Sequence, residues 1–92
     1  MSAARQSVTI VNKRGLHARA SAKFVGAVSA LPDGTKVRVA KGGSEAAGGS
    51  ILGLMMLGAA MGDAIELIVE GGDAELVLGE LVALVGNGFG EE

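Results

Sequence analysis

Apolar residues change their spacing repeatedly along this chain, and no other feature of the sequence limits the possible folds as strongly. Some stretches alternate apolar and polar side chains, which is typical of a strand with one buried face. Others place apolar side chains three and four residues apart, which predicts a helix with one buried stripe. The stretches follow the order β-α-β-β-α-β-α, with turn-forming Gly, Pro and Asp residues between them.

Four stretches are predicted to be strands: residues 6–12, 35–41, 44–47 and 64–70. The third has weak β-propensity, but Gly42 and Gly43 before it suit the two-residue turn of a hairpin. Glu66 and Glu70 should face outward from the last strand. The residues expected on the buried face of the sheet are Val8, Ile10, Val37, Val39, Ile65, Leu67 and Val69.

Three stretches are predicted to be helices: residues 18–30, 51–57 and 74–85. Pro32 ends the first, Ser50 and Asp73 are expected to cap the second and third, and Gly86 ends the third. The apolar stripes are Phe24, Ala27, Val28 and Leu31 in the first helix, and Val77, Leu78, Leu81, Leu84 and Val85 in the last. The elements together predict an α+β fold with helices packed on one face of a sheet.

Length and composition limit the chain to one small domain, residues 1–92, and a hydrophobic content of 49% is enough for one core. There is no cysteine and only one histidine, so we expect no disulfide, no metal site and no cofactor. The N-terminus lacks the apolar core of a signal peptide, and the longest apolar run, residues 51–61, is too short to span a bilayer. We therefore expect a cytoplasmic protein without membrane insertion.

Charge is divided unevenly along the chain. All eight Lys and Arg residues lie at or before Lys41, whereas nine of the ten acidic residues follow it. A basic half of this kind can steer an acidic partner or a phosphate. Nucleic acid is the competing ligand, but stacking would need aromatic side chains, and the chain has only Phe24 and Phe89. We expect no nucleic-acid binding.

The only histidine, His17, follows the turn formers Asn12 and Gly15 and stands where the first helix should begin. The first N–H groups of a helix lack intrahelical acceptors and lie at the positive end of its dipole, so they favour an anion such as phosphate. Neutral imidazole is a nucleophile, and the charge of Arg19 favours the neutral form and would stabilise an attached phosphoryl group. On residue types alone, a capping or surface histidine is the commoner alternative.

Two motifs resemble the active-site and regulatory segments of HPr, the histidine phosphocarrier family of the phosphoenolpyruvate-dependent phosphotransferase system. They are Gly15-Leu16-His17-Ala18-Arg19 and Ser50-Ile51-Leu52-Gly53-Leu54-Met55-Met56-Leu57-Gly58. Their spacing, the chain length and the ending Gly88-Phe89-Gly90-Glu91 also fit. The resemblance implies an open-faced β-sandwich, with a four-stranded antiparallel sheet and three helices on one face.

The resemblance also implies roles for single residues. His17 would carry phosphate on Nδ1, Arg19 would contact the phosphoryl group, and Ser50 would be modified by HPr kinase/phosphorylase. The protein would be a monomeric carrier rather than a catalyst, taking phosphate from enzyme I and giving it to EIIA-type domains. The chain departs from the family pattern at Ala20 and Ser21, where Pro-Ala is common, and at Ala47 and Gly49, where Asn and Lys are frequent before the serine.

The second helix is apolar on every face, so part of it should be exposed in so small a domain. Leu54 and Leu57 are expected in the core. The resemblance places the family's docking surface in this segment. The residues predicted to bind partner proteins are Ile51, Leu52, Met55 and, next to Arg19 on the outer face of the first helix, Lys23.

Two other functions stay open at this level. One is a regulatory module of the nitrogen-related phosphotransferase branch, whose phosphorylation state would decide which proteins it binds. The other is a small enzyme that uses His17 as a general base. The second lacks support in the sequence, because no carboxylate lies near His17 along the chain.

Overall fold

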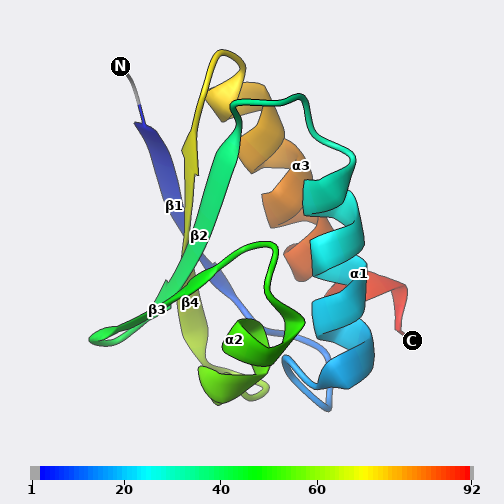
Figure 1. Ribbon diagram of the computed structural model, residues 1–92. Coiled ribbons are helices and arrows are strands. Elements are labelled where there is room, and N and C mark those ends of the chain that lie inside the picture. The colour runs from blue at the N-terminus through cyan, green and yellow to red at the C-terminus, as the bar shows by residue number, and fades with distance from the viewer. Residues whose placement is uncertain (1–2, 92) are drawn as a thin grey trace.

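The computed structural model describes residues 3–91, in which a four-stranded sheet carries three helices on one face (Figure 1). The element order β-α-β-β-α-β-α is the one predicted from the sequence. A short 3₁₀ turn, η1, follows the last helix. The elements are β1 (Ala3–Thr9), α1 (Ala18–Ser29), β2 (Lys36–Lys41), β3 (Ser44–Ala47), α2 (Ile51–Met56), β4 (Ala64–Glu70), α3 (Ala74–Gly86) and η1 (Gly88–Gly90).

The strands lie in the order β1-β4-β2-β3, and every neighbouring pair is antiparallel. The strand β4 therefore pairs on both sides, with β1 and with β2. The β2–β3 hairpin turns at Gly42, whose φ of 58° is in the left-handed region that favours glycine. The predicted inward residues of β2 and β4 are buried, at no more than 7% exposed.

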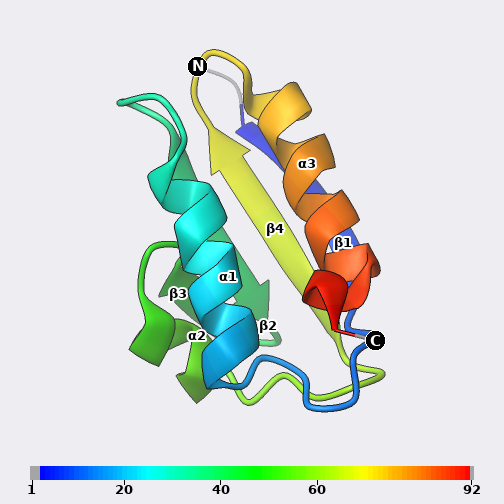
Figure 2. The same ribbon diagram turned by 90° about the vertical axis from the view of Figure 1, so that its right-hand side faces the viewer.

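The helices α1 and α3 lie side by side over the sheet, with β4 visible between them in Figure 2. Phe24 of α1 is 1% exposed and packs with the sheet in the core. On the predicted stripes, Ala27, Val28, Leu31 and Leu84 are only partly buried, whereas Val77, Leu78, Leu81 and Val85 are buried. Among the described residues no helix is long and apolar enough to cross a membrane.

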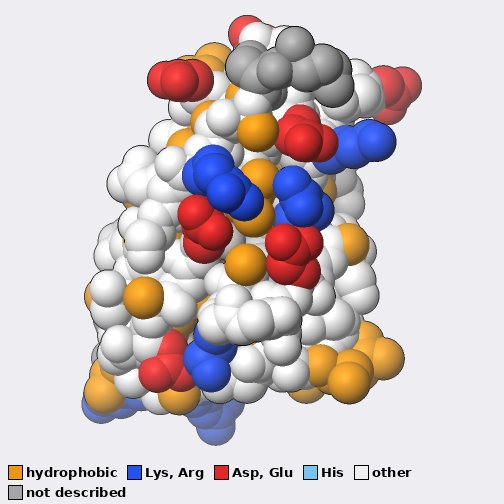
Figure 3. Space-filling view, turned by 90° about the vertical axis from the view of Figure 1, so that its left-hand side faces the viewer, with side chains coloured by type: hydrophobic (Ala, Val, Ile, Leu, Met, Phe, Trp, Pro, Cys, Tyr) orange, Lys and Arg blue, Asp and Glu red, His pale blue; other side chains and the backbone are white. Residues whose placement is uncertain are grey.

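The outer face of the sheet carries positive and negative side chains next to one another, with hydrophobic side chains between them (Figure 3). Ile68 points to this face yet is 1% exposed, and its neighbours across β1 and β2 are Arg5 and Arg38. These arginines lie 3.8 and 3.9 Å from Glu66 and Glu70. Exposed ion pairs stabilise little, but arginine stems can cover apolar surface. The sequence did not indicate that Ile68 would be buried.

Two details of the predicted elements are wrong. The first strand spans Ala3–Thr9 rather than 6–12, because its pairing runs from Ala3 opposite Glu70 to Thr9 opposite Ala64, so the length of β4 sets its ends. Asp73 precedes α3 as predicted, but its side chain makes no capping hydrogen bond. Ser50, in contrast, does cap α2.

The turn before His17 depends on close contact between two loops. Gly15 has a φ of +64°, and a Cβ there would lie 2.3 Å from the carbonyl oxygen of Ala59. The next residue, Leu16, donates its N–H to that same oxygen at 3.0 Å. The segment after α2 therefore holds the turn that leads into α1.

We predict that Gly15→Ala destabilises the protein more than Gly58→Ala. Both glycines have nearly the same positive φ, +64° and +66°, but a Cβ at position 58 would meet nothing within 4 Å. Gly58→Ala should cost about 1 kcal/mol of backbone strain. Gly15→Ala should cost about 1–3 kcal/mol more, because two backbones must move apart. Denaturant unfolding of both variants measures the difference, and equal losses would show that the contact with Ala59 is unimportant.

Candidate functional site

His17 is the N-cap residue of α1, as the sequence predicted. Its carbonyl accepts the N–H of Ser21 at 2.9 Å, and its ring Nδ1 accepts the backbone N–H of Arg19 at 3.3 Å. Ser21 is fully buried, and its hydroxyl donates to the carbonyl of Leu16. The imidazole is thus part of the helix cap, and its Nδ1 lies beside the first N–H groups of α1.

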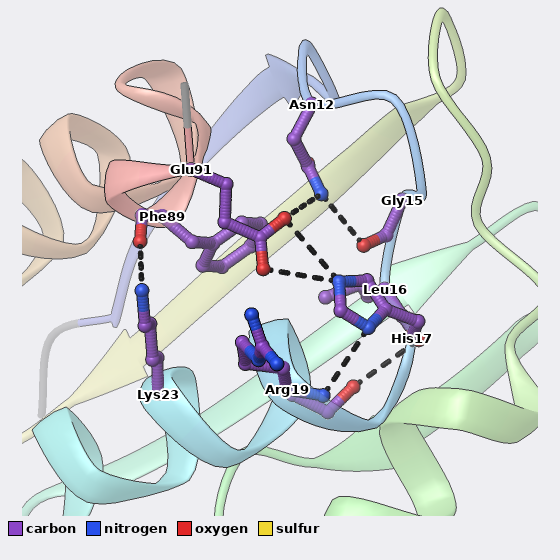
Figure 4. A network of polar contacts seen from close by, with 9 residues as sticks. Asn12, Gly15, Leu16, His17, Arg19, Lys23, Phe89 and Glu91 are labelled. Carbon is purple, nitrogen blue, oxygen red and sulfur yellow. Dashed lines mark hydrogen bonds and ion pairs between the residues drawn. The ribbon is translucent and has the colours of Figure 1, made fainter.

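A carboxylate from the other end of the chain lies against the same ring (Figure 4). Glu91 places its Oε2 3.1 Å and its Oε1 3.3 Å from Nε2 of His17. Both side chains are largely covered, at 22% exposed for His17 and 17% for Glu91. Sequence reasoning missed this contact, since 74 positions separate the two residues. The sequence showed only that no carboxylate lies near His17 along the chain, and the fold brings one to it in space.

A strained turn after α3 delivers Glu91 to the ring. Gly88, Phe89 and Gly90 all have positive φ, at 64°, 58° and 75°, and Phe89 is the only non-glycine residue of the described chain in that region. Such a conformation costs on the order of 1 kcal/mol or more for a non-glycine residue. The Phe89 ring is 1% exposed in the core, and its carbonyl accepts the ammonium of Lys23 at 2.9 Å. Burial and this hydrogen bond hold the turn in place.

Asn12 joins the turn before His17 to the C-terminal segment. Its Nδ2 donates to the carbonyl of Gly15 at 2.9 Å and to Oε1 of Glu91 at 3.2 Å. Because both partners are acceptors, the amide must point its nitrogen toward them. Its Oδ1 is the one buried side-chain nitrogen or oxygen among residues 3–91 without a hydrogen-bond partner. Asn12 therefore leaves its own Oδ1 without a hydrogen bond, while its Nδ2 holds the Gly15 carbonyl and the Glu91 carboxylate in place.

The two contacts of the imidazole select one neutral tautomer. The backbone N–H of Arg19 can only donate, so Nδ1 must present its lone pair. The ionised carboxylate of Glu91 can only accept, so Nε2 must carry the proton. The geometry thus leaves an unprotonated nitrogen, Nδ1, at the helix N-terminus and a protonated one at the carboxylate.

The electrostatics of the site combine one carboxylate with several cations. The hydrogen bond from His17 lowers the pKa of the Glu91 carboxyl; burial opposes this shift, while the Asn12 hydrogen bond, the charge of His17 when its ring is protonated and the charge of Lys23 support it. Lys13, Arg14 and Arg19 are exposed and take part in none of the ion pairs within residues 3–91. In Figure 4 Arg19 lies beside His17.

Ser50 and α2 lie next to the helix that begins at His17. The hydroxyl of Ser50 accepts the N–H of Gly53 at 2.9 Å, and α2 packs against α1 (Figures 1 and 2). Leu54 and Leu57 are buried, as predicted. The exposed apolar residues here are Ile51 (41%), Leu52 (68%) and Met55 (40%), together with Met56 (77%), which the sequence analysis did not single out.

The predicted partner-binding residues do not all have free side chains. Ile51, Leu52 and Met55 are open to solvent, but the ammonium of Lys23 is already bonded to the Phe89 carbonyl. No group of three His, Asp or Glu side chains within residues 3–91 is placed to hold a metal ion. The site is therefore built from His17, its cap and its carboxylate, beside an apolar helix.

Comparison with known proteins gives consistent matches. Residues 4–87 match the family described as PTS HPr component phosphorylation site. The phosphocarrier protein HPr of Neisseria meningitidis is 46% identical over 87 residues, covering 95% of this chain and 96% of that protein. The crystal structure of HPr-C-His from Thermoanaerobacter tengcongensis superposes with a TM-score of 0.88 at 37% identity, covering 97% and 98% of the two chains.

These matches extend over nearly the whole chain, so this protein belongs to the HPr family of phosphocarrier proteins of the phosphotransferase system. The open-faced α+β fold predicted from the sequence is confirmed by the same comparisons. One relative carries a different name. The phosphocarrier protein NPr of Shewanella violacea is 40% identical over 91 residues, covering 99% of this chain and 98% of that protein.

We predict that the Glu91 contact is lost in acid. Its carboxyl has a pKa below the ordinary value of 4.5, so its contribution to stability is present above that value and disappears as the pH falls through the lowered pKa. Between about pH 5 and about pH 2, wild type should lose more stability than Glu91→Gln. Glu80→Gln, on the exposed side of α3, should keep the wild-type dependence. Parallel curves for wild type and Glu91→Gln would contradict the shift.

Proposed function

We propose that this protein accepts a phosphoryl group on Nδ1 of His17 from phosphorylated enzyme I and passes it to an EIIA-type domain in the cytoplasm. It acts as a covalent carrier and not as a catalyst. The observation that supports this best is the placement of an unprotonated Nδ1 at the N-terminus of α1. There a nucleophile and donors for the transferred group lie together.

The transfer needs one exchange of hydrogen bonds. The lone pair of Nδ1 accepts the N–H of Arg19 at 3.3 Å, which is a long bond and therefore weak. When that lone pair attacks phosphorus, the N–H is released beside the new phosphoryl oxygens and can donate to them. The Arg19 guanidinium can add a charge-assisted hydrogen bond. The N–H group that contacts the imidazole in the unphosphorylated protein would thus stabilise the phosphoryl group in the phosphorylated protein.

The surroundings of His17 suit an acidic partner with an apolar contact surface. The exposed cations Lys13, Arg14 and Arg19 would steer its approach. The side chains of Ile51, Leu52 and Met55 would then pack against it, with Lys23 at the edge of the interface. We propose these residues as the docking surface for both enzyme I and the EIIA-type acceptor.

Incubation with enzyme I and labelled phosphoenolpyruvate tests the carrier function. Wild type should gain an acid-labile label on His17, and His17→Ala should gain none while losing only about 0.5–2 kcal/mol of stability, the usual cost of a lost cap. Arg19→Ala should be labelled roughly tenfold more slowly, because a charge-assisted bond is lost while the helix N–H groups stay. Label on folded His17→Ala, or turnover of a small molecule without label, would rule out the carrier.

We further propose Ser50 as a site that HPr kinase/phosphorylase modifies. Its hydroxyl caps α2 directly before the exposed Ile51 and Leu52. A phosphate there would add about −1.5 to −2 charges at a helix N-terminus, which the helix dipole tolerates. At a docked interface the same charge would have to be desolvated or would face acidic groups.

We predict that Ser50→Asp folds normally but binds enzyme I about tenfold more weakly or worse, and is labelled more slowly on His17. Ser50→Ala should bind like wild type, although the lost cap costs about 1 kcal/mol of stability. Ser44→Asp adds the same charge at the exposed first residue of β3 and serves as the control. Calorimetric titration measures the affinities. Unchanged affinity of Ser50→Asp would show that the docking surface lies elsewhere.

A regulatory module is the second candidate function, and the NPr relative favours it. In that case the phosphorylation state of His17 would decide which proteins the chain binds rather than support sugar uptake. Mixing the labelled protein with sugar-specific EIIA domains separates the two functions. Rapid loss of label to such a domain supports transport. Retained label, together with partners that bind only one phosphorylation state, supports regulation.

A further inference from the structure

Glu91 occupies a place in the site that the proposed transfer to Nδ1 does not by itself require. Its carboxylate contacts Nε2, the ring nitrogen on the far side from Nδ1. Three further features keep it there: the Nδ2 of Asn12 on its Oε1, the left-handed turn at Phe89, and the bond from Lys23 to the Phe89 carbonyl. These contacts hold the largely covered carboxylate in one place against the ring.

We infer that Glu91 is a positioning residue for phosphoryl transfer, which holds the proton on Nε2 of His17 and offsets the charge of the ring while Nδ1 carries phosphate. This inference rests on the proposed function. The contact distances of 3.1 and 3.3 Å place both carboxylate oxygens within reach of that proton. Carboxylates bond the second ring nitrogen of metal-ligating histidines in a similar way, and there they fix the tautomer and orientation of the ring.

The charge of the His17 ring changes during phosphoryl transfer, and this change gives the nearby carboxylate of Glu91 its role. The lone pair of Nδ1 forms the bond to phosphorus, and the bond from phosphorus to the phosphorylated donor protein breaks with its electron pair left on the donor. The proton stays on Nε2, so the neutral ring becomes a phosphoryl-imidazolium with one positive charge. Glu91 lies beside that charge throughout. When the phosphoryl group moves on, the pair returns to Nδ1 and the ring is neutral again.

The negative charge of Glu91 also repels the phosphoryl group, but this effect is the smaller of the two. The carboxylate lies in direct contact with Nε2, whereas the phosphoryl group is bonded to Nδ1 and faces the N-terminus of α1. Coulomb energies fall with distance, and the helix N–H groups and Arg19 offset the phosphoryl charge. The net effect of Glu91 is therefore to keep the ring protonated and the phosphoryl group easy to transfer.

The test compares wild type with Glu91→Gln, which keeps the shape of the side chain but removes its charge and can also donate to Nε2. Imidazole ¹⁵N spectra should show a single neutral tautomer in wild type, with the proton on Nε2, and a mixture in Glu91→Gln. Labelling by enzyme I should be about tenfold slower, because the positive charge that develops on the ring loses its contact with a carboxylate. The phosphorylated variant should nevertheless hydrolyse more slowly, because its ring loses the Nε2 proton more readily.

Slower gain together with slower loss of phosphate is a combination that a merely loosened structure would not give. Glu80→Gln makes the same charge change on the exposed side of α3 and should match wild type in all three measurements. Wild-type tautomer, labelling and hydrolysis in Glu91→Gln would overturn the inference and leave the carrier function standing. Absence of label on His17 in the wild-type protein would instead overturn the carrier function, and this inference with it.

Discussion

The imidazole of His17 lies between a backbone N–H, which can only donate, and a carboxylate, which can only accept. This pair of contacts decides which nitrogen is free to react, and most of the surrounding structure serves to place the two partners. The N–H belongs to the first turn of α1. The carboxylate belongs to Glu91, which the turn at Phe89 brings back over that helix.

Different packing contacts hold the two partners of the imidazole, the start of α1 and Glu91, in place. The start of α1 is positioned by Gly15, whose missing side chain lets the turn touch the carbonyl of Ala59. Glu91 is positioned by Phe89, whose burial in the core stabilises a backbone conformation that would otherwise be unfavourable. Asn12 links the two by bonding to both Gly15 and Glu91. The site therefore joins the segment between β1 and α1 to the segment that follows α3.

The folded structure also determines which of the basic side chains form ion pairs. Arg5, Arg38 and Lys41 pair with acidic residues that follow Lys41 in the sequence, on and around the outer face of the sheet. Lys13, Arg14 and Arg19, the exposed basic residues around His17, take part in none of the ion pairs within residues 3–91. The sequence alone showed that basic residues come first and acidic residues follow. Folding then leaves the basic side chains around His17 outside these ion pairs.

Sequence by itself determined the order and type of the elements, the capping positions of His17 and Ser50, and the inward residues of the sheet, because these follow from local spacing and from backbone groups within a few residues. Only the tertiary structure decided the ends of β1, the burial of Ile68 and the meeting of Glu91 with His17. The reason is physical. Each of these results depends on which distant segments pack together, and a contact across 74 positions leaves no periodicity in the sequence.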